Sequence, residues 1–337
     1  MPVRRGMYRL LRRTAVVAAV TATAVPAHAA FPAHAAFPAH AAFPAHAVTR
    51  AAAPVDVRLP GTSTTVREDP ADPARVASYT VGKAVYLRRG SRFVRRTGDA
   101  EVTVAPKGTV ALAVPSSYTA GYDSVTVFDI ATGRGTRIRT VRKPLVAGFA
   151  RWSRDGRKAV LTVRRKSGNG WAATGFVLVD AAAKSARVVT VPGADPAARF
   201  RWSPDGAELV AGHRGGTRFY GQDGKVRRTL AGTGAPAGGD DAFSPSGRGM
   251  TTWCPAAYTE HVCVWDRTTG RLAARVNLRP ETLWGWWDEK HLVAVVAHGG
   301  AYRAILSDLR GGTVRVLAEI PAADWRKKLY LGYRTAR

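Results

Sequence analysis

Short runs of alternating hydrophobic and polar residues, separated by polar turns, fill most of the chain. Alternation with a period of two is typical of half-buried strands, and a turn with glycine between two such runs indicates a β-hairpin. Four segments share this order of run, turn and run: VTVAPKGTVALAV (102–114), FARWSRDGRKAVLTV (149–163), FRWSPDGAELVAG (200–212) and AFSPSGRGMTTW (242–253). Their turn glycines, at positions 108, 156, 206 and 247, lie 48, 50 and 41 residues apart. The hairpin is therefore an internal repeat.

A degenerate fifth copy of the hairpin is WGWWDEKHLVAVV (284–296). Each copy is followed by a second hairpin: VTVFDIATGRGTRI (125–138), FVLVDAAAKSARVV (176–189), TRFYGQDGKVRRTL (217–230), VCVWDRTTGRLAARV (262–276) and AILSDLRGGTVRVL (304–317). Each unit thus contains four antiparallel strands. A sheet of this size needs neighbours to cover its faces, and radial stacking of such sheets gives a β-propeller.

The ends of the repeated region determine the number of blades. A hairpin at 84–97 (AVYLRRGSRFVRRT), preceded by VASYT at 76–80, supplies three strands before the first full copy. The segment KLYLGYRT (328–335) supplies one further strand. If it joins the three early strands, both open edges of the ring are paired. The sequence predicts an all-β, six-bladed propeller of four-stranded antiparallel blades, closed by the C-terminal strand.

The segments RWSPDGAELVAG (201–212) and VWDRTTGRL (264–272) resemble the repeats of TolB-like and WD40-like (PD40-type) propellers, which follow F-S-P-D-G-x-x-L and W-D-x-x-T-G. The resemblance covers about residues 76–335 and implies the fold. It implies little about function, because propellers have many unrelated roles. TolB has an extra α/β domain before its propeller, where this chain has an apparent linker. The role of TolB in envelope translocation is therefore not carried over.

The first residues have the pattern of a secretory signal peptide. A basic head, MPVRRGMYRLLRR, precedes a short apolar run, TAVVAAVTATAV, and the small-x-small motif Ala27-His28-Ala29. We expect a signal peptide at 1–29, a disordered Ala/Pro/His repeat and linker at 30–70, and the propeller at 71–337. No later run is apolar enough for a transmembrane span. The general secretory route is preferred to the twin-arginine route that Arg12-Arg13 weakly suggests. The protein is expected to be bacterial and extracytoplasmic, either secreted or bound to the cell envelope.

The stretch AHAAFPAHAAFPAHAAFPAHA (27–47) places a histidine in every six residues. Each unit repeats the Ala-His-Ala cleavage motif and contains a proline, which disfavours a helix that could align the histidines. The interpretation is a copied processing site, not a metal site. Cleavage is expected after Ala29, with Ala35, Ala41 and Ala47 as the other candidates.

The chain is strongly basic, with a formal net charge of +27. Residues 48–337 keep 46 basic and 24 acidic side chains, a net charge of +22. Such a field attracts polyanions and anionic surfaces. The arginines are scattered along the chain without a long basic block, which is unlike a specific nucleic-acid footprint. A GC-rich genome would give the same excess of Arg over Lys without any function.

Two cysteines, Cys254 and Cys263, flank a predicted strand–loop–strand connection. Because the protein is expected to be exported, we predict a disulfide between them. The alternatives are two free thiols or a metal pair with His261. Two cysteines alone are a weak metal signal, and no metal or other cofactor is predicted.

Recurring aspartates and tryptophans are the remaining candidates. The aspartates are expected to hold turns, since Asp bonds its own backbone two residues on: Asp129, Asp155, Asp180, Asp205, Asp266 and Asp308. Trp152, Trp202 and Trp265 occupy repeat positions and are expected in the core. Trp284, Trp286 and Trp287 crowd one degenerate turn. Core packing is the favoured interpretation for the group. They are also the tentative ligand contacts, because an exposed ring among them could stack on a sugar or dock a peptide.

No motif for catalysis was found, since both G-x-S-x-G and H-E-x-x-H are absent from the sequence. The favoured function is an exported, non-catalytic propeller, expected to be monomeric, that binds a protein, peptide or anionic envelope polymer. The alternatives are a polysaccharide lyase or glycosidase acting in the central cleft, and a purely structural envelope role.

Overall fold

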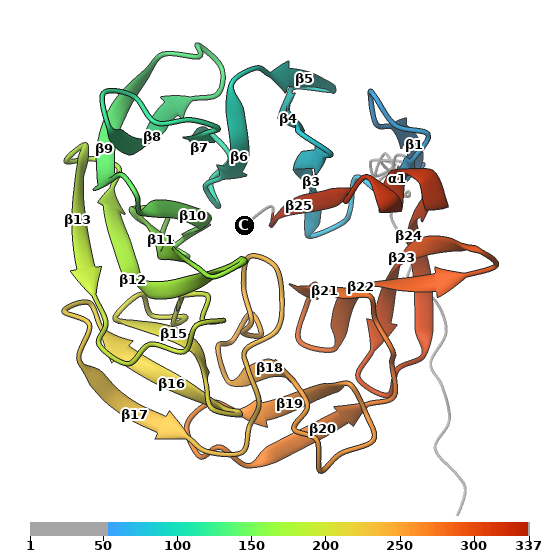
Figure 1. The fold of residues 1–337 in the computed structure, drawn as a ribbon. Helices are drawn as coiled ribbons and strands as arrows, with labels where there is room; N and C mark the ends of the chain where they lie inside the picture. Colours follow the sequence, from blue (N-terminus) through green and yellow to red (C-terminus); the bar gives the residue numbers. More distant parts are fainter. Residues whose placement is uncertain (1–52, 336–337) are drawn as a thin grey trace, which may run out of the picture. The chain divides into compact units, whose positions relative to one another are not determined.

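The computed structural model describes residues 53–335, which form a ring of six β-sheets around a central axis (Figure 1). The expected signal peptide, the histidine repeat and all four cleavage positions lie outside the described residues. Each sheet is antiparallel, and successive sheets follow one another around the ring. The predicted six-bladed propeller is confirmed. Within residues 53–335, no helix has the length and hydrophobicity needed to span a bilayer.

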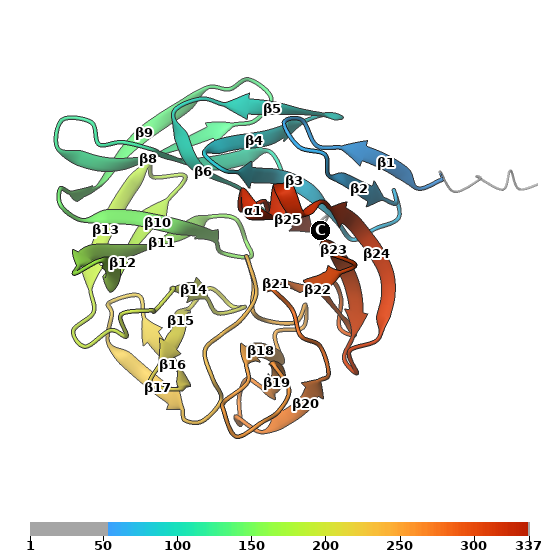
Figure 2. The same cartoon turned by 45° about the vertical axis from the view of Figure 1, so that its right-hand side comes forward.

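The first blade joins the two ends of the described chain. Its strands, from the axis outward, are β25 (Tyr330–Thr335), β3 (Ala74–Val81), β4 (Ala84–Arg89) and β5 (Arg92–Arg96). β25 pairs antiparallel with β3, so that Leu331 lies opposite Tyr79. The predicted closure of the ring by residues 328–335 is confirmed (Figure 2).

The next three blades follow the predicted repeat. The second contains β6 (Asp99–Val104), β7 (Val110–Pro115), β8 (Tyr122–Asp129) and β9 (Gly135–Arg142). The third contains β10 (Val146–Trp152), β11 (Lys158–Ser167), β12 (Gly170–Asp180) and β13 (Ser185–Thr190). The fourth contains β14 (Arg201–Trp202), β15 (Glu208–His213), β16 (Gly216–Gly221) and β17 (Val226–Leu230). Gly108, Gly156 and Gly206 have φ of 76°, 69° and 69°, which explains why glycine recurs at these turns.

The fifth blade departs from the predicted four regular strands. It contains β18 (Gly249–Trp253), β19 (Val262–Asp266) and β20 (Leu272–Val276). Its innermost place is taken by residues 242–244, which join β18 through a single bridge between Phe243 and Met250. The neighbouring Asp241 instead forms a parallel bridge to Gly285 of the sixth blade.

The sixth blade contains β21 (Thr282–Trp286), β22 (His291–His298), β23 (Ala301–Asp308) and β24 (Thr313–Ile320). Two further strands, β1 (Val55–Arg58) and β2 (Thr65–Glu68), extend this sheet beyond β24. The expected linker at 30–70 is therefore wrong for residues 55–68, which form a hairpin. The buried Val66 lies opposite Ala318 of β24, a partner too distant in sequence for a local pattern to reveal.

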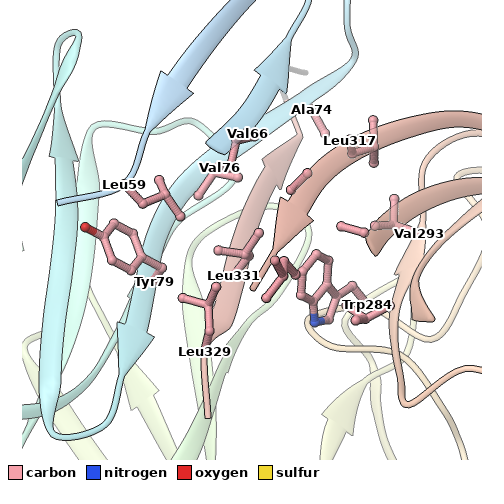
Figure 3. Packing of buried hydrophobic residues seen from close by; sticks show 14 of the residues in the cluster. Leu59, Val66, Ala74, Val76, Tyr79, Trp284, Val293, Leu317, Leu329 and Leu331 are labelled. Atoms are coloured by element: carbon pink, nitrogen blue, oxygen red, sulfur yellow. The ribbon is translucent and has the colours of Figure 1, made fainter. Parts of the chain in front are cut away.

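A hydrophobic cluster fills the seam between the first and sixth blades (Figure 3). Leu59 from the β1–β2 hairpin, Leu331 from β25 and Trp284 from β21 all belong to it. The short helix α1 (Ala322–Arg326) leads from β24 to β25 and lies beside this seam. Three parts of the chain that are far apart in sequence thus share one core.

Tryptophan side chains connect successive blades near the axis. The indole Nε1 of Trp152 donates to the carbonyl of Thr103 at 3.3 Å, and that of Trp202 donates to the carbonyl of Arg151 at 3.1 Å. In the same way, Trp286 donates to the carbonyl of Ala242 at 3.2 Å. Trp152 and Trp202 are buried, as their equivalent repeat positions predict.

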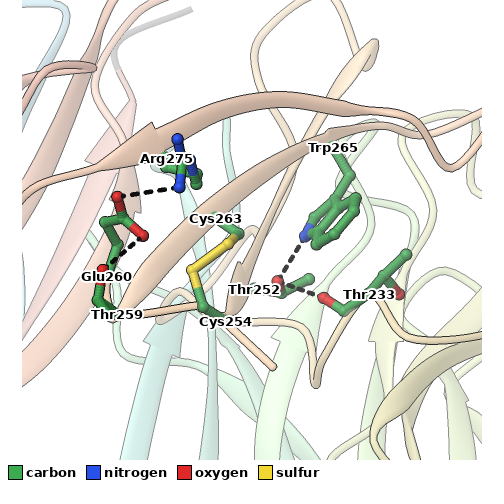
Figure 4. Close-up of a disulfide and its surroundings, with 8 residues drawn as sticks. All are labelled: Thr233, Thr252, Cys254, Thr259, Glu260, Cys263, Trp265 and Arg275. Carbon is green, nitrogen blue, oxygen red and sulfur yellow. Dashed lines mark hydrogen bonds and ion pairs between the residues drawn. A yellow bond between two sulfur atoms is a disulfide. The ribbon is translucent and has the colours of Figure 1, made fainter. Parts of the chain in front are cut away.

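Cys254 and Cys263 form a disulfide, with their Cα atoms 5.0 Å apart (Figure 4). Cys263 lies on β19, and Cys254 directly follows β18. The bond closes the loop between these two strands at its base. Next to it, the buried Trp265 donates from Nε1 to the hydroxyl of Thr252 at 2.8 Å.

Candidate functional site

The inner strands of the third and fourth blades bring several arginines to the central channel. Arg151 lies near the end of β10, Arg201 begins β14, and Arg199 precedes it. In two repeats an arginine directly precedes the tryptophan at the equivalent repeat position, as Arg151-Trp152 and Arg201-Trp202. Only the tryptophans of these pairs were predicted from the sequence, as core residues. The repeated Arg-Trp dipeptide was the available signal for this cluster.

Arg151 lies between two carboxylates. Its Nη1 is 3.6 Å from Glu101 Oε1 and its Nε is 3.5 Å from Asp240 Oδ1. Nε also donates to the carbonyl of Gly239 at 2.7 Å. Burial raises the pKa of Glu101, although Arg151 and two backbone N–H groups act in the opposite direction. The sequence analysis identified neither carboxylate as a candidate.

The segment Pro236–Pro245, here called the strap, replaces the inner strand of the fifth blade. Arg201 donates to the carbonyls of Pro236 and Gly238, at 3.2 and 2.6 Å. Arg154, from the β10–β11 turn, reaches the carbonyls of Phe243, Ser244 and Pro245 and the carboxylate of Asp241. In a regular strand, the backbone carbonyls would accept hydrogen bonds from a neighbouring strand. In the strap, arginine side chains of the third and fourth blades donate to several of these carbonyls instead.

A row of alternating aromatic and cationic side chains lies at the channel mouth. The guanidinium carbon of Arg164 is 5.6 Å from the ring centroid of Trp171 and 4.5 Å from that of Phe149. The guanidinium carbon of Arg199 is 4.3 Å from the Phe149 centroid. These distances are within the range of cation–π attraction. We call Trp171, Arg164, Phe149 and Arg199 the mouth row.

Phe149 is held in an unusual backbone conformation. Its φ is +57°, in the left-handed region that non-glycine residues seldom adopt. The carboxylate of Glu101 accepts hydrogen bonds from the backbone N–H of Phe149 at 2.8 Å and of Ala150 at 2.7 Å. The strand pairing of β10 shifts register here, between Gly148 and Arg151. Glu101 thus fixes the bulge that presents the Phe149 ring at the mouth.

Phe149 separates two cavities. One, of about 240 Å³, is bordered by Arg151, Arg199 and Asp240. The other, of about 280 Å³, is bordered by Arg164 and Trp171. Both also contain Glu101 in their walls.

A third cavity, of about 250 Å³, is bordered by Trp286, Arg154 and Arg334. It shares Asp240 of the strap and Tyr333 of β25 with the first cavity.

The two arginines of the mouth row form no ion pair within the described residues, although the charge of Glu101 acts to raise the pKa of both. Arg151 and Arg154 have acidic partners, whereas no ion pair within residues 53–335 includes Arg164 or Arg199. The Nε of Arg164 is buried and makes no hydrogen bond within the described part of the chain. Burial and the charge of Arg199 lower the pKa of Arg164. Burial, with the nearby charge of Arg151, also lowers the pKa of Arg201 to about 10.

The three tentative ligand contacts lie in different environments. Trp284 and Trp287 are 7% and 6% exposed and belong to the seam core. They therefore offer almost no ring surface to a ligand. Trp286 is half-buried and borders the third cavity. None of the three belongs to the mouth row, whose aromatic members the sequence analysis did not select.

The recurring aspartates accept hydrogen bonds from backbone N–H groups in their own turns, at distances of 2.7–3.0 Å. The acceptors are Asp129, Asp155, Asp180, Asp205, Asp266 and Asp308. Their predicted role in turns accounts for these contacts. Within residues 53–335, no group of three or more His, Cys, Asp or Glu side chains is arranged to hold a metal.

Comparisons with known proteins find similarity in the fold. No family model matches the chain, and no curated protein matches it. Among solved structures, TolB from Acinetobacter baumannii is 16% identical with a TM-score of 0.48, covering 80% of this chain and 67% of that chain. An oligogalacturonate lyase in complex with manganese is 13% identical with a TM-score of 0.51, covering 77% and 82%. A chain of a nidogen/laminin complex is 15% identical with a TM-score of 0.50, covering 78% and 98%.

The shared feature is the propeller. Identities of this size show the fold alone, because one architecture carries many unrelated functions. The propeller fold that the resemblance implied is confirmed by the six sheets of the structure itself.

Proposed function

We propose that this protein is an exported, non-catalytic propeller that binds a protein, peptide or anionic polymer of the cell envelope at its channel mouth. The observation that carries the proposal is that Arg164 and Arg199 lie beside two cavities without an ion-pair partner in the described part of the chain. A guanidinium presents a planar set of donors that suits carboxylate and phosphate groups. An anionic group of the partner would supply the direct ion-pair partner that these two guanidinium groups do not have.

The net charge of the chain supports the same proposal. The net charge of +22 that residues 48–337 carry raises the local concentration of anionic partners and speeds their association, with a strong dependence on salt. A mouth that concentrates this field in partly enclosed cavities would direct the partner to the axis of the ring.

Export is supported by two independent features. The first is the signal-peptide pattern of residues 1–29. The second is the disulfide between Cys254 and Cys263, since disulfides persist in oxidising compartments outside the cytoplasm.

An enzyme acting on a polysaccharide is the second candidate, and Glu101 and Asp240 on either side of Arg151 favour it. Paired carboxylates are the usual groups of glycoside hydrolysis. However, both oxygens of Glu101 accept backbone N–H groups, which gives this side chain a positioning role. Burial raises the pKa of the neighbouring Tyr330 to about 12, which disfavours it as a base.

The proposal is tested by sedimentation of the purified protein with envelope fractions from its own source. We expect retention at low salt and release at moderate salt. The double variant Arg164→Glu/Arg199→Glu should lose retention. Its matched control, Arg95→Glu/Arg187→Glu, changes two exposed arginines on the outermost strands β5 and β13 by the same charge. Equal loss of retention in both double variants would contradict a site at the mouth. So would a wild-type protein that is not retained at either salt concentration.

The enzyme candidate needs a separate measurement. Envelope polysaccharide incubated with the wild-type protein should keep its length distribution on size-exclusion chromatography. Progressive shortening that Glu101→Gln abolishes would instead support the enzyme.

A further inference from the structure

The cavity on the Arg164 side of Phe149 has a mixed lining. Trp171 borders it with an indole that is 46% exposed. Ser116, Ser117 and Tyr118 contribute hydroxyl groups to its wall. An exposed flat ring, several hydroxyls and a guanidinium without an ion-pair partner therefore face one space. Two carboxylates, Glu101 and Asp123, also border it, but both oxygens of each accept backbone N–H groups.

We propose that the mouth row is a subsite for a carboxylated polysaccharide, an inference that rests on the proposed binding function. Trp171 stacks on the apolar face of one sugar ring. Arg164 binds the carboxylate of the chain at this position, and the hydroxyls of the cavity wall pair with sugar hydroxyls. Arg199 binds a second carboxylate on the other side of Phe149.

The geometry of the two arginines supports a ligand with repeated charges. Both guanidinium carbons lie within 4.5 Å of the same Phe149 ring centroid. The two guanidinium carbons therefore cannot be farther apart than their two distances to this centroid combined. A guanidinium that stacks on a ring keeps its N–H edge free for a carboxylate. Two guanidinium groups this close together match a polymer that carries an acidic group on successive units.

The hydroxyls are able to accept as well as to donate. Tyr118 donates its proton to the carbonyl of Leu145 at 2.9 Å, and Ser116 donates to the carbonyl of Gly98 at 3.1 Å. Their oxygens keep free lone pairs, which are acceptors for the hydroxyl protons of a sugar. An acidic peptide has carboxylates but few hydroxyls, and it would leave these acceptors and the Trp171 face unused.

The test measures binding of defined probes to the full chain by isothermal titration calorimetry. The probes are an oligogalacturonate of about six sugars, its methyl ester, an uncharged malto-oligosaccharide of equal length and an oligoglutamate of equal charge. We expect the oligogalacturonate to bind most tightly. The methyl ester and the uncharged sugar should bind at least about tenfold more weakly, because they cannot form charge-assisted hydrogen bonds.

Variants separate the contributions of ring and charge. Arg164→Gln and Arg199→Gln should each weaken oligogalacturonate binding about tenfold or more, while the outer-strand control Arg95→Gln should leave it unchanged. Trp171→Ala should weaken oligogalacturonate and leave oligoglutamate unaffected. Thermal melting of each variant checks that it is folded. The comparison of oligogalacturonate with its methyl ester uses the wild-type protein and so does not depend on the folding of any variant.

Two results would overturn the inference. Oligoglutamate binding as tightly as oligogalacturonate, with no effect of Trp171→Ala, would indicate a site for acidic peptides. Failure of oligogalacturonate to bind while envelope fractions still retain the protein through Arg164 and Arg199 would remove the sugar assignment alone. Loss of envelope retention as well would remove the binding function itself.

Discussion

The hydroxyl of Thr64 donates a buried hydrogen bond of 2.9 Å to the carboxylate of Asp324, 260 residues further along the chain. The same carboxylate oxygen accepts the backbone N–H of Ser63 at 2.8 Å. Asp324 lies on α1, directly before the closing strand β25, and Thr64 lies in the β1–β2 hairpin. One side chain therefore ties the early hairpin to the element that closes the ring.

Asp324→Ala should destabilise the propeller by about 2–3 kcal/mol, because it leaves buried donors of the hairpin without an acceptor. The measurement is urea unfolding followed by tryptophan fluorescence. Asp56→Ala is the control. The Asp56 side chain is 67% exposed, and its ion pair with Arg67 is long, at 3.9 Å. Equal effects of the two substitutions would mean that the link to Asp324 adds no stability.

Reduction of the Cys254–Cys263 disulfide should cost about 2–3 kcal/mol on a chain-entropy model, since the bond closes a short loop. Unfolding curves with and without a reducing agent give the difference. In the double variant Cys254→Ser/Cys263→Ser, the reducing agent should have no effect. A remaining effect there would assign the loss to another cause.

Trp202→Phe should cost about 1–2 kcal/mol, because the carbonyl of Arg151 loses its indole donor while most of the buried ring volume is kept. Trp171→Phe removes an indole that is 46% exposed and should change stability little. Thermal melting of both variants provides the comparison. If the two melt alike, the inter-blade hydrogen bond contributes nothing measurable.

At Phe149, glycine should be more stable than alanine by about 1 kcal/mol, because the φ of +57° suits a residue without Cβ. Both substitutions remove the ring between Arg164 and Arg199, so both should weaken binding of an anionic probe. Comparing Phe149→Gly with Phe149→Ala in urea unfolding separates backbone strain from side-chain packing. A more stable alanine variant would show that the bulge relaxes.

The raised pKa of Glu101 predicts a pH dependence of stability. A carboxyl whose pKa is raised in the folded state favours folding when protonated, and this contribution is lost as pH rises from about its ordinary pKa of 4.5 through the raised value. Over that range the wild type should lose stability relative to Glu101→Gln. Unfolding free energies of both proteins at a series of pH values test this, and an opposite slope would contradict it.

Local patterning was enough to predict the repeat, the six blades and the closing strand, because each hairpin carries its alternation and turn glycine within a few residues. It missed the hairpin of β1 and β2, whose packing partners β24 and Asp324 are more than 240 residues away. It also selected Trp284 and Trp287 by their crowding, although the seam between the first and last blades buries both.

The mouth row could not be found in this way, because its residues are separated along the chain. Phe149, Arg164 and Trp171 lie on the neighbouring strands β10, β11 and β12 of the third blade, and Arg199 precedes β14 of the fourth. The pairing within one blade and the packing of the next blade against it bring them together. The Arg-Trp dipeptides of β10 and β14 were the one sequence signal near this site. Their arginines, Arg151 and Arg201, donate hydrogen bonds to carbonyls of the strap.

The pairing of β25 with β3 sets a time order for assembly. The inner edge of β3 has no partner until Tyr330–Thr335 have been synthesised, when the other five blades are already complete in sequence. A chain growing from its N-terminus therefore carries an unpaired strand edge throughout elongation. The ring cannot close before residues 330–335 have been synthesised, and any truncation before residue 330 should yield a chain prone to edge-to-edge association.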